Sequence, residues 1–195
     1  MIFNTYQLGI LWGCSSYADG RIVLRHKNRY FLEQIQPIVA KQIYRQDGRT
    51  ADQYVLKFRY DIAELEAIGY TRRNDSIRIL PECADLYFLQ AYLELHGSFD
   101  WQTAYSGSKT RRRKYYKKRL RVFGNYHLLQ GISDILSKCC GCADKTIQTM
   151  AISSKTCYIS YCNQREIENI IHTFRRRDPC FMPFWNTYEC VKLFL

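Results

Sequence analysis

The strongest constraint on the fold is a helical pattern that the chain carries twice. The first copy covers residues 6–17 (YQLGILWGCSSY) and the second covers residues 88–99 (FLQAYLELHGSF). Each copy is typical of an apolar helix with small residues along one face, followed by a short polar corner and a strand. Because Gly9, Gly13 and Ala91 carry little or no side chain, two such helices are expected to pack with their backbones close together.

The same order of predicted elements follows each helix. In the first half a helix over 5–13 precedes strands over 15–18 and 21–26, a helix over 29–39, strands over 41–46 and 53–59, and a helix over 61–68. In the second half a helix over 85–95 precedes strands over 98–105 and 116–123, a helix over 126–138, strands over 145–152 and 156–161, and a helix over 163–173. The sequence therefore predicts an α+β fold of two αββαββα repeats.

Short local signals support this order. Asp19-Gly20 predicts a tight hairpin turn between the first two strands. Asn28 and Asn125 precede the corresponding helix of each half and are expected to act as N-caps. The two halves thus share their capping residues as well as their helices.

The spacing of the two motif helices sets the domain boundaries. Cys14 and His96 follow the two predicted helices and lie 82 residues apart. The expected organisation is a first repeat over 1–70, a linker over 71–84, a second repeat over 85–173, and a basic, aromatic tail over 174–195. A repeat of this size within one chain predicts a pseudo-dimer with a pseudo-two-fold axis.

This arrangement resembles the LAGLIDADG homing endonucleases, over roughly residues 5–173. A Leu80-Pro81 step before the second motif helix adds to the resemblance. The resemblance implies that antiparallel sheets from the two repeats form a saddle over DNA. It also implies that the two helices place the residues at their ends side by side, where active members of the family have Asp or Glu. Cys14 and His96 stand at those positions here.

The residues at these two positions argue against DNA cleavage. Mg²⁺ is held by oxygen ligands, whereas a thiolate is a soft ligand and imidazole a nitrogen donor. We therefore expect no metal and no cofactor, and we assign Cys14 and His96 as catalytic positions that are inactive.

If cleavage were retained, Mg²⁺ would be the cofactor, and Asp19 and Glu94 would be the first ligands to consider. We place Asp19 in the turn and Glu94 at the helix interface or in solvent. A nucleophilic Cys14–His96 pair is the remaining alternative, but the sequence offers no third orienting group.

The charge of the chain predicts a polyanionic partner. It has 29 Lys and Arg against 18 Asp and Glu, a net charge of +11 and a pI near 9.3. The most basic stretch covers residues 109–121, where Leu120 and Val122 are expected to face the helices. In the first half, Ile22 and Leu24 are expected to face inward, although aligning Asn28 with Asn125 shifts that strand by one residue and leaves its face open. The predicted DNA-binding residues are Arg21, Arg25, Lys57, Arg59, Arg111, Arg112, Arg113, Lys117, Arg119 and Arg121.

The cysteine spacing and the hydropathy argue against a zinc site and a membrane span. Cys139, Cys140 and Cys142, with Cys157 and Cys162, raise the option of a zinc site, but their spacing lacks two compact pairs, so core thiols are the preferred interpretation. No segment is apolar for long enough to span a membrane, and the first residues do not form a signal peptide. We therefore expect a cytoplasmic protein with reduced thiols that acts as a monomer and has no membrane partner.

The sequence thus predicts a protein that binds specific double-stranded DNA without cutting it, as a transcription regulator on this scaffold would. One alternative is a Mg²⁺-dependent homing endonuclease. The other is an RNA-binding intron maturase, because nothing in the sequence separates DNA from RNA as the partner.

Overall fold

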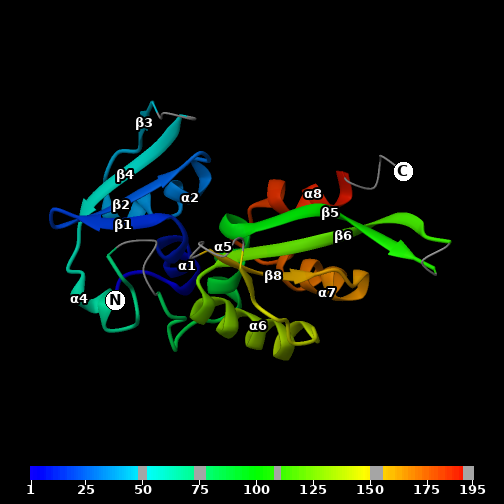
Figure 1. Cartoon of the computed structure of the whole chain (residues 1–195). Coiled ribbons are helices and arrows are strands. Elements are labelled where there is room, and N and C mark those ends of the chain that lie inside the picture. Colours follow the sequence, from blue (N-terminus) through cyan, green and yellow to red (C-terminus); the bar gives the residue numbers. More distant parts are fainter. Residues whose placement is uncertain (48–51, 73–77, 108–110, 150–155, 191–195) are drawn as a thin grey trace. The chain divides into compact units, whose positions relative to one another are not determined.

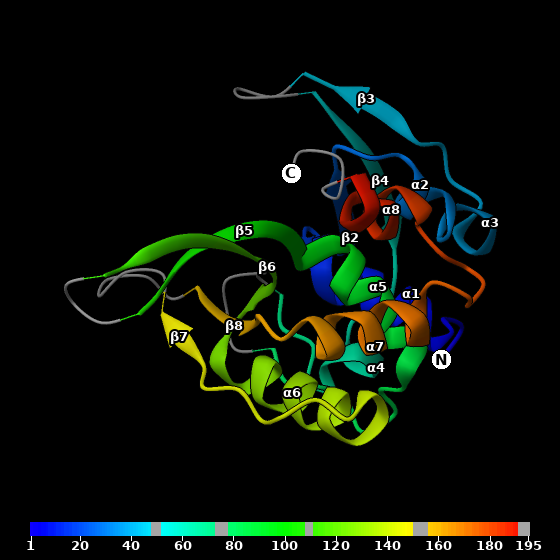
Figure 2. The same cartoon turned by 90° about the vertical axis from the view of Figure 1, so that its right-hand side faces the viewer.

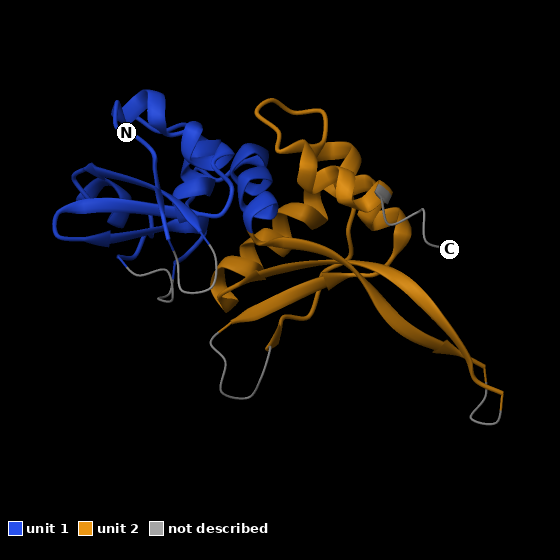
Figure 3. Cartoon of the chain, turned by 90° about the horizontal axis from the view of Figure 1, so that it is seen from above, with its two compact units in different colours: residues 1–95 blue, residues 96–195 orange. Residues whose placement is uncertain are grey.

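A computed structural model gives the fold for residues 1–47, 52–72, 78–107, 111–149 and 156–190. The chain forms two compact units, Met1–Leu95 and His96–Leu195, which Figure 3 shows in two colours. Each unit contains a four-stranded antiparallel sheet and helices (Figure 1), so the predicted α+β class is confirmed. None of the helices within the described ranges combines the length and apolar composition that a membrane crossing needs.

The first unit begins and ends with the two motif helices. Helix α1 spans Thr5–Cys14 and α5 spans Leu86–His96, of which all but the last residue belongs to this unit. Asn4 begins α1 through a capping box: its side chain accepts a hydrogen bond from the backbone N–H of Gln7, whose side chain accepts one from the N–H of Asn4. The remaining elements of this unit are β1 (Ser15–Ala18), β2 (Arg21–His26), α2 (Tyr30–Glu33), α3 (Gln36–Val39), β3 (Tyr44–Gln46), β4 (Gln53–Arg59) and α4 (Ala63–Glu66).

The sheet of the first unit has the strand order β1-β2-β4-β3. Ile22 lies opposite Phe58 and Leu24 lies opposite Leu56, and all four side chains are buried on one face. Asp19 and Gly20 both have positive φ angles, 52° and 71°, as a tight hairpin turn requires. The inward positions of Ile22 and Leu24 are thus as predicted, which settles the open question of the strand's face.

One predicted helix of the first unit is divided. The sequence pattern predicted a single helix over 29–39, but the structure has two helices of four residues each. Pro37 is the physical reason, because it has no backbone N–H to donate and its ring clashes with the preceding turn of a helix. It is accommodated in the first turn of α3, where that N–H has no partner to lose.

The second unit repeats the topology with a longer first pair of strands. Its elements are β5 (Gly97–Ser106), β6 (Arg113–Gly124), α6 (Tyr126–Cys140), β7 (Gln148–Thr149), β8 (Cys157–Tyr161), α7 (Gln164–Phe174) and α8 (Met182–Cys190). The strand order β5-β6-β8-β7 matches that of the first unit. Asn125 caps α6, as predicted, by accepting from the backbone N–H of Leu128. The end of the strand predicted over 145–152 lies outside the described residues.

The helices of the second unit all lie on one side of its sheet, which leaves the opposite face open (Figure 3). Figure 2 shows α6 and α7 next to each other on that side. The tail also folds onto this unit: Trp185 of α8 stacks on Phe174 of α7 with a ring separation of 5.8 Å, and Phe184 lies 5.1 Å from Phe99 of β5. The aromatic residues of the tail therefore complete the core of the second unit.

Candidate nucleic-acid interface

The ends of the two motif helices are the first place to look for chemistry. Within the first unit α1 and α5 approach closely, because a Cβ atom added to Gly9 would lie 2.5 Å from the backbone oxygen of Phe88 and 2.8 Å from the Cβ of Ala91. This is the close contact that the small residues predicted. Cys14 is the last residue of α1 and His96 the last of α5, and each is followed directly by the first strand of a sheet. That the two side chains lie side by side stays a prediction.

Cys14 is held as a neutral thiol. Its Sγ donates to the backbone oxygen of Ile10 at 3.3 Å. Burial raises the pKa of the Cys14 thiol to about 12, and the nearby Arg78 lowers it by less than burial raises it. The thiolate is therefore scarce near neutral pH, and a protonated thiol is neither a metal ligand nor a strong nucleophile.

Neither Glu94 nor Asp19, the two carboxylates considered as alternative metal ligands, stands at the end of a motif helix. Glu94 is buried in the first unit, where it accepts a hydrogen bond from the Tyr6 hydroxyl at 2.6 Å and one from Gln90 at 3.3 Å. Asp19 is exposed at the β1–β2 turn. Across the described part of the chain, no group of three or more His, Cys, Asp or Glu side chains could hold a metal ion.

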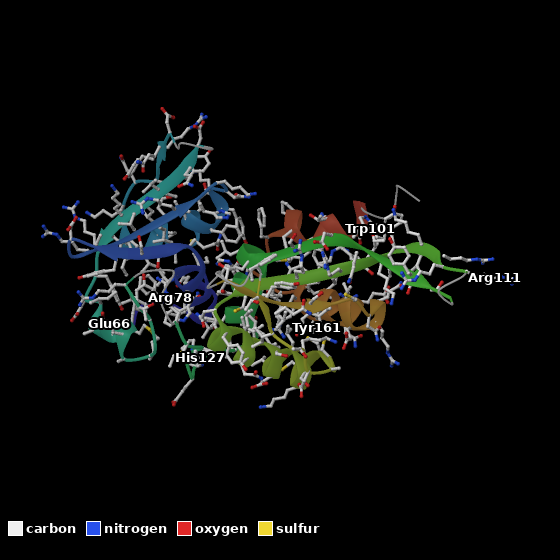
Figure 4. The ribbon with its side chains drawn as sticks, viewed as in Figure 1. Glu66, Arg78, Trp101, Arg111, His127 and Tyr161 are labelled. Carbon is white, nitrogen blue, oxygen red and sulfur yellow. The ribbon has the colours of Figure 1, made fainter. Side chains whose placement is uncertain are left out.

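A buried arginine supports the end of α1. Arg78 is 1% exposed and donates to the backbone oxygens of Leu11 at 3.2 Å and of Trp12 and Ser15 nearby. Its guanidinium also lies 4.2 Å from the ring of Tyr70, and burial lowers its pKa. Figure 4 shows Arg78 in the first unit, close to α1. The sequence contained Arg78 in a linker and gave no sign of this role.

The predicted basic residues of the first unit share the face of the sheet that points away from its core. Arg21 lies directly opposite Arg59, Val23 opposite Lys57, and Arg25 opposite Val55. Arg21, Arg25, Lys57 and Arg59 are all exposed. A shallow pocket of about 660 Å³ lies beside three of them and Lys41, so positive charge gathers at this end of the sheet.

The predicted basic residues of the second unit also share one face, but two of them are tied to a carboxylate. Lys117, Arg119 and Arg121 alternate with Lys118, Leu120 and Val122 along β6. Asp100 of β5 lies opposite Arg119 and forms ion pairs with both Arg119 and Arg121. Burial raises the pKa of Asp100, but the hydrogen bonds and charges of the two arginines outweigh it and hold that pKa below its usual value.

The hairpin of β5 and β6 extends beyond the helices, with Arg111 at its far end (Figures 1 and 4). Arg111, Arg112 and Arg113 are exposed there. Three exposed tyrosines lie among these cations: Arg112 lies over the ring of Tyr105, Lys114 over Tyr116, and Lys117 over Tyr115, at 5.1–5.5 Å. The sequence pattern indicated the cations but not the tyrosines, although Tyr115 and Tyr116 lie within the basic stretch of residues 109–121.

Neither a protein-family model nor a curated protein sequence matches the chain. Solved structures do match its fold. The I-LtrWI LAGLIDADG homing endonuclease bound to target DNA is 14% identical, with a TM-score of 0.63, over 97% of this chain and 88% of that one. I-SmaMI bound to cleaved DNA is 12% identical, with a TM-score of 0.61 over the same shares. I-SmaMI bound to uncleaved target with calcium ions is 11% identical, with a TM-score of 0.61, over 96% and 88%.

The match covers nearly the whole chain and includes both sheets and both motif helices. At such low identity it defines the fold and leaves individual side chains unassigned. The resemblance read from the two repeated helices is thereby confirmed: this chain has the fold of the LAGLIDADG homing endonucleases.

Proposed function

We propose that this protein binds specific double-stranded DNA through the open faces of its two sheets and does not cut it. The observation that carries the proposal is the basic character of both faces. Each sheet presents Arg and Lys on the face opposite its main apolar side chains, in a fold whose solved examples include complexes with DNA. In the first sheet, the buried Val23 and Val55 lie among these cations. The net charge of +11 is consistent with a polyanion as the partner.

The geometry of a strand pair fits the major groove of duplex DNA. That groove is wide enough to admit a two-stranded β-ribbon, and arginine and lysine side chains on it can reach base edges and phosphates. Lys57, Lys117 and Arg119 lie in the middle of strands and are suited to bases. Arg111, Arg112 and Arg113 lie at the end of the hairpin, where they are suited to phosphates and contribute affinity for any sequence.

The absence of cleavage rests on the residues at the helix ends. Cutting a phosphodiester with Mg²⁺ requires a metal-bound water and carboxylate ligands near the scissile phosphate. Cys14 is a neutral thiol, and His96 offers a nitrogen donor rather than an oxygen. A protein that recognises a site and leaves it intact would serve as a regulator.

Selection from a library of random duplexes, followed by incubation of the selected site with Mg²⁺ or Mn²⁺, tests both parts of the proposal. We expect enrichment of a defined site, affinity that falls steeply with added salt, and intact DNA after incubation. Replacing Arg111, Arg112 and Arg113 together with Ala should weaken binding to all duplexes alike. Salt-insensitive binding, or none, would contradict the DNA-binding function. Specific double-strand cleavage by the unmodified protein would contradict the loss of catalysis alone.

RNA binding is a second candidate, favoured by Tyr105, Tyr115 and Tyr116. Exposed aromatic rings among cations are the usual means of stacking unpaired bases in single-stranded nucleic acid. Competition decides between the two candidates. If a structured RNA displaces the selected duplex at lower concentration than unlabelled duplex does, and Tyr116→Ala weakens only RNA binding, RNA is the preferred partner.

A further inference from the structure

We propose that Asp100 fixes Arg119 in the orientation that reads a guanine in the major groove. The inference rests on the proposed DNA-binding function and deepens it by naming the base. It concerns three residues on the open face of the second sheet: Asp100, Arg119 and Arg121, which we call the Asp100 cluster. Their side chains are partly exposed, at 25%, 19% and 25% respectively, so the cluster is accessible from solvent.

The contact between Asp100 and Arg119 uses only one edge of the guanidinium. Nε of Arg119 donates to Oδ1 of Asp100 at 2.8 Å, and Nη2 donates to Oδ2 at 3.1 Å. A guanidinium carries five N–H donors in a plane, and these two occupy the side next to the stem. The outer edge, formed by Nη1 and the second hydrogen of Nη2, keeps a pair of parallel donors.

That free edge matches guanine and no other base. Guanine presents two acceptors, O6 and N7, side by side in the major groove. Adenine and cytosine each place an amino donor there, which would oppose the donors of Arg119, and thymine offers one acceptor beside a methyl group. An arginine held with its outer edge toward the groove therefore selects guanine.

Arg121 holds Asp100 from the other side. Its Nη2 donates to the same Oδ2 atom, and its guanidinium lies 5.1 Å from the ring of Phe123 and 6.0 Å from that of Tyr158. Arg121 is thus anchored on the sheet and less free to reach a base. Asp100 accepts three hydrogen bonds on two oxygens, which leaves little of its acceptor capacity for direct contact with a cytosine amino group.

Asp100 does more than balance the charge of Arg119, because its two hydrogen bonds fix the orientation of the Arg119 guanidinium. A free arginine loses the motion of several rotatable bonds when it binds a base, and this cost lowers its discrimination. Two strands in fixed register place Asp100 directly opposite Arg119, so the orientation exists before DNA arrives. Asp100 is in this sense a positioning residue, acting on bases through Arg119.

The test compares three variants in selection from a random duplex library. Asp100→Asn keeps the shape of the side chain and weakens its hold on Arg119, and Arg119→Met keeps an unbranched side chain and removes its donors. Asp134→Asn on the exposed surface of α6 makes the same change in net charge away from the sheet and serves as the control. We expect wild type and Asp134→Asn to enrich guanine at one position of the site. Asp100→Asn and Arg119→Met should lose that preference at the same position, by about 5- to 150-fold.

Each other outcome overturns the inference in a distinguishable way. If Asp100→Asn selects the same site as wild type with equal strength, the inference fails and the DNA-binding function stands. If Asp100→Asn weakens binding to every duplex, including one without the site, Asp100 supports the sheet rather than Arg119. If Arg119→Met retains the guanine preference, another residue reads that base pair. If wild-type protein enriches no sequence, sequence-specific binding and the inference fail together.

Discussion

At the scale of single residues, Arg78 is a buried cation that supports the end of α1. The last carbonyl groups of a helix lack hydrogen-bond partners within the helix and carry partial negative charge. A buried cation there donates hydrogen bonds to these carbonyl groups and balances their charge. Arg78 does this for α1, whose final residue is Cys14. A fourth backbone acceptor, Thr71, joins the linker to the same guanidinium at 3.0 Å.

We expect Arg78→Met to lower the free energy of unfolding by about 3 kcal/mol or more, because it leaves several buried carbonyl groups without a donor. Arg78→Lys should cost less, about 1–2 kcal/mol, since the ammonium retains charge and some hydrogen bonds but cannot span all the acceptors. Urea denaturation measures both.

Arg72 provides the matched control from the same segment. It is exposed and pairs with Glu66 at 2.9 Å, so Arg72→Ala should cost at most about 1 kcal/mol. Equal losses for the Arg72 and Arg78 variants would show that the buried cap contributes no more than a surface ion pair.

At the scale of elements, the close contact between α1 and α5 requires that Gly9 has no side chain. An added Cβ at Gly9 would overlap a backbone oxygen, which cannot move aside as the end of a flexible side chain can. Overpacking of this kind costs about 1–3 kcal/mol. The higher helix propensity of alanine returns about 1 kcal/mol, so the two effects oppose each other.

We expect overpacking to win, so that Gly9→Ala lowers the free energy of unfolding by about 1–2 kcal/mol. Gly9→Ser, with one more atom, should cost more. Adding Ala91→Gly to Gly9→Ala should recover part of the loss, because it removes the second short contact but leaves the oxygen of Phe88. Chemical denaturation of this series provides the test, and a Gly9→Ala variant more stable than wild type would mean that the helices separate without penalty.

The sequence patterns predicted some helices and strands of the fold and missed others. Alternation of apolar and charged residues predicted β2 and β4 because each strand has one face on the core, and the faces of Ile22 and Leu24 followed from it. Asn125 predicted the start of α6, and Asp19-Gly20 predicted the turn of the first hairpin. The helix predicted over 29–39 is divided into α2 and α3, and Pro37 was the residue in the sequence that indicated this division. The strand predicted over 98–105 matches β5 to within one residue at each end, but β6 begins at Arg113, before the predicted 116. That outer part of β6 is exposed and carries no apolar alternation, so the sequence pattern did not show it.

The candidate site was less predictable, for a different physical reason. The basic residues follow from charge and alternation, and the structure places them on the open faces as expected. The Asp100 cluster depends on strand register, which local pattern does not determine when the facing residues are polar. Arg78 depends on backbone acceptors, which every residue carries and no sequence motif marks.

At the scale of the whole molecule, the two units carry basic faces on sheets of the same strand order within one chain. Two copies of a DNA-binding surface are usually brought together by dimerisation, as in proteins that read half-sites about one helical turn apart. A single chain with both surfaces has no need of a second copy. The complex with DNA is therefore expected to contain one protein molecule on one duplex.

Stoichiometry and salt dependence together test this last prediction. We expect sedimentation of the complex with the selected duplex to give one chain per duplex. The slope of log affinity against log salt should fall for Arg21→Ala with Arg59→Ala in the first sheet, and also for Arg112→Ala with Arg113→Ala in the second, by about 1 for each phosphate contact removed. Lys138→Ala, on the exposed surface of α6, should leave the slope unchanged. If only one pair of substitutions changes the slope, or if one chain binds two duplexes, the two sheets do not act on a common site.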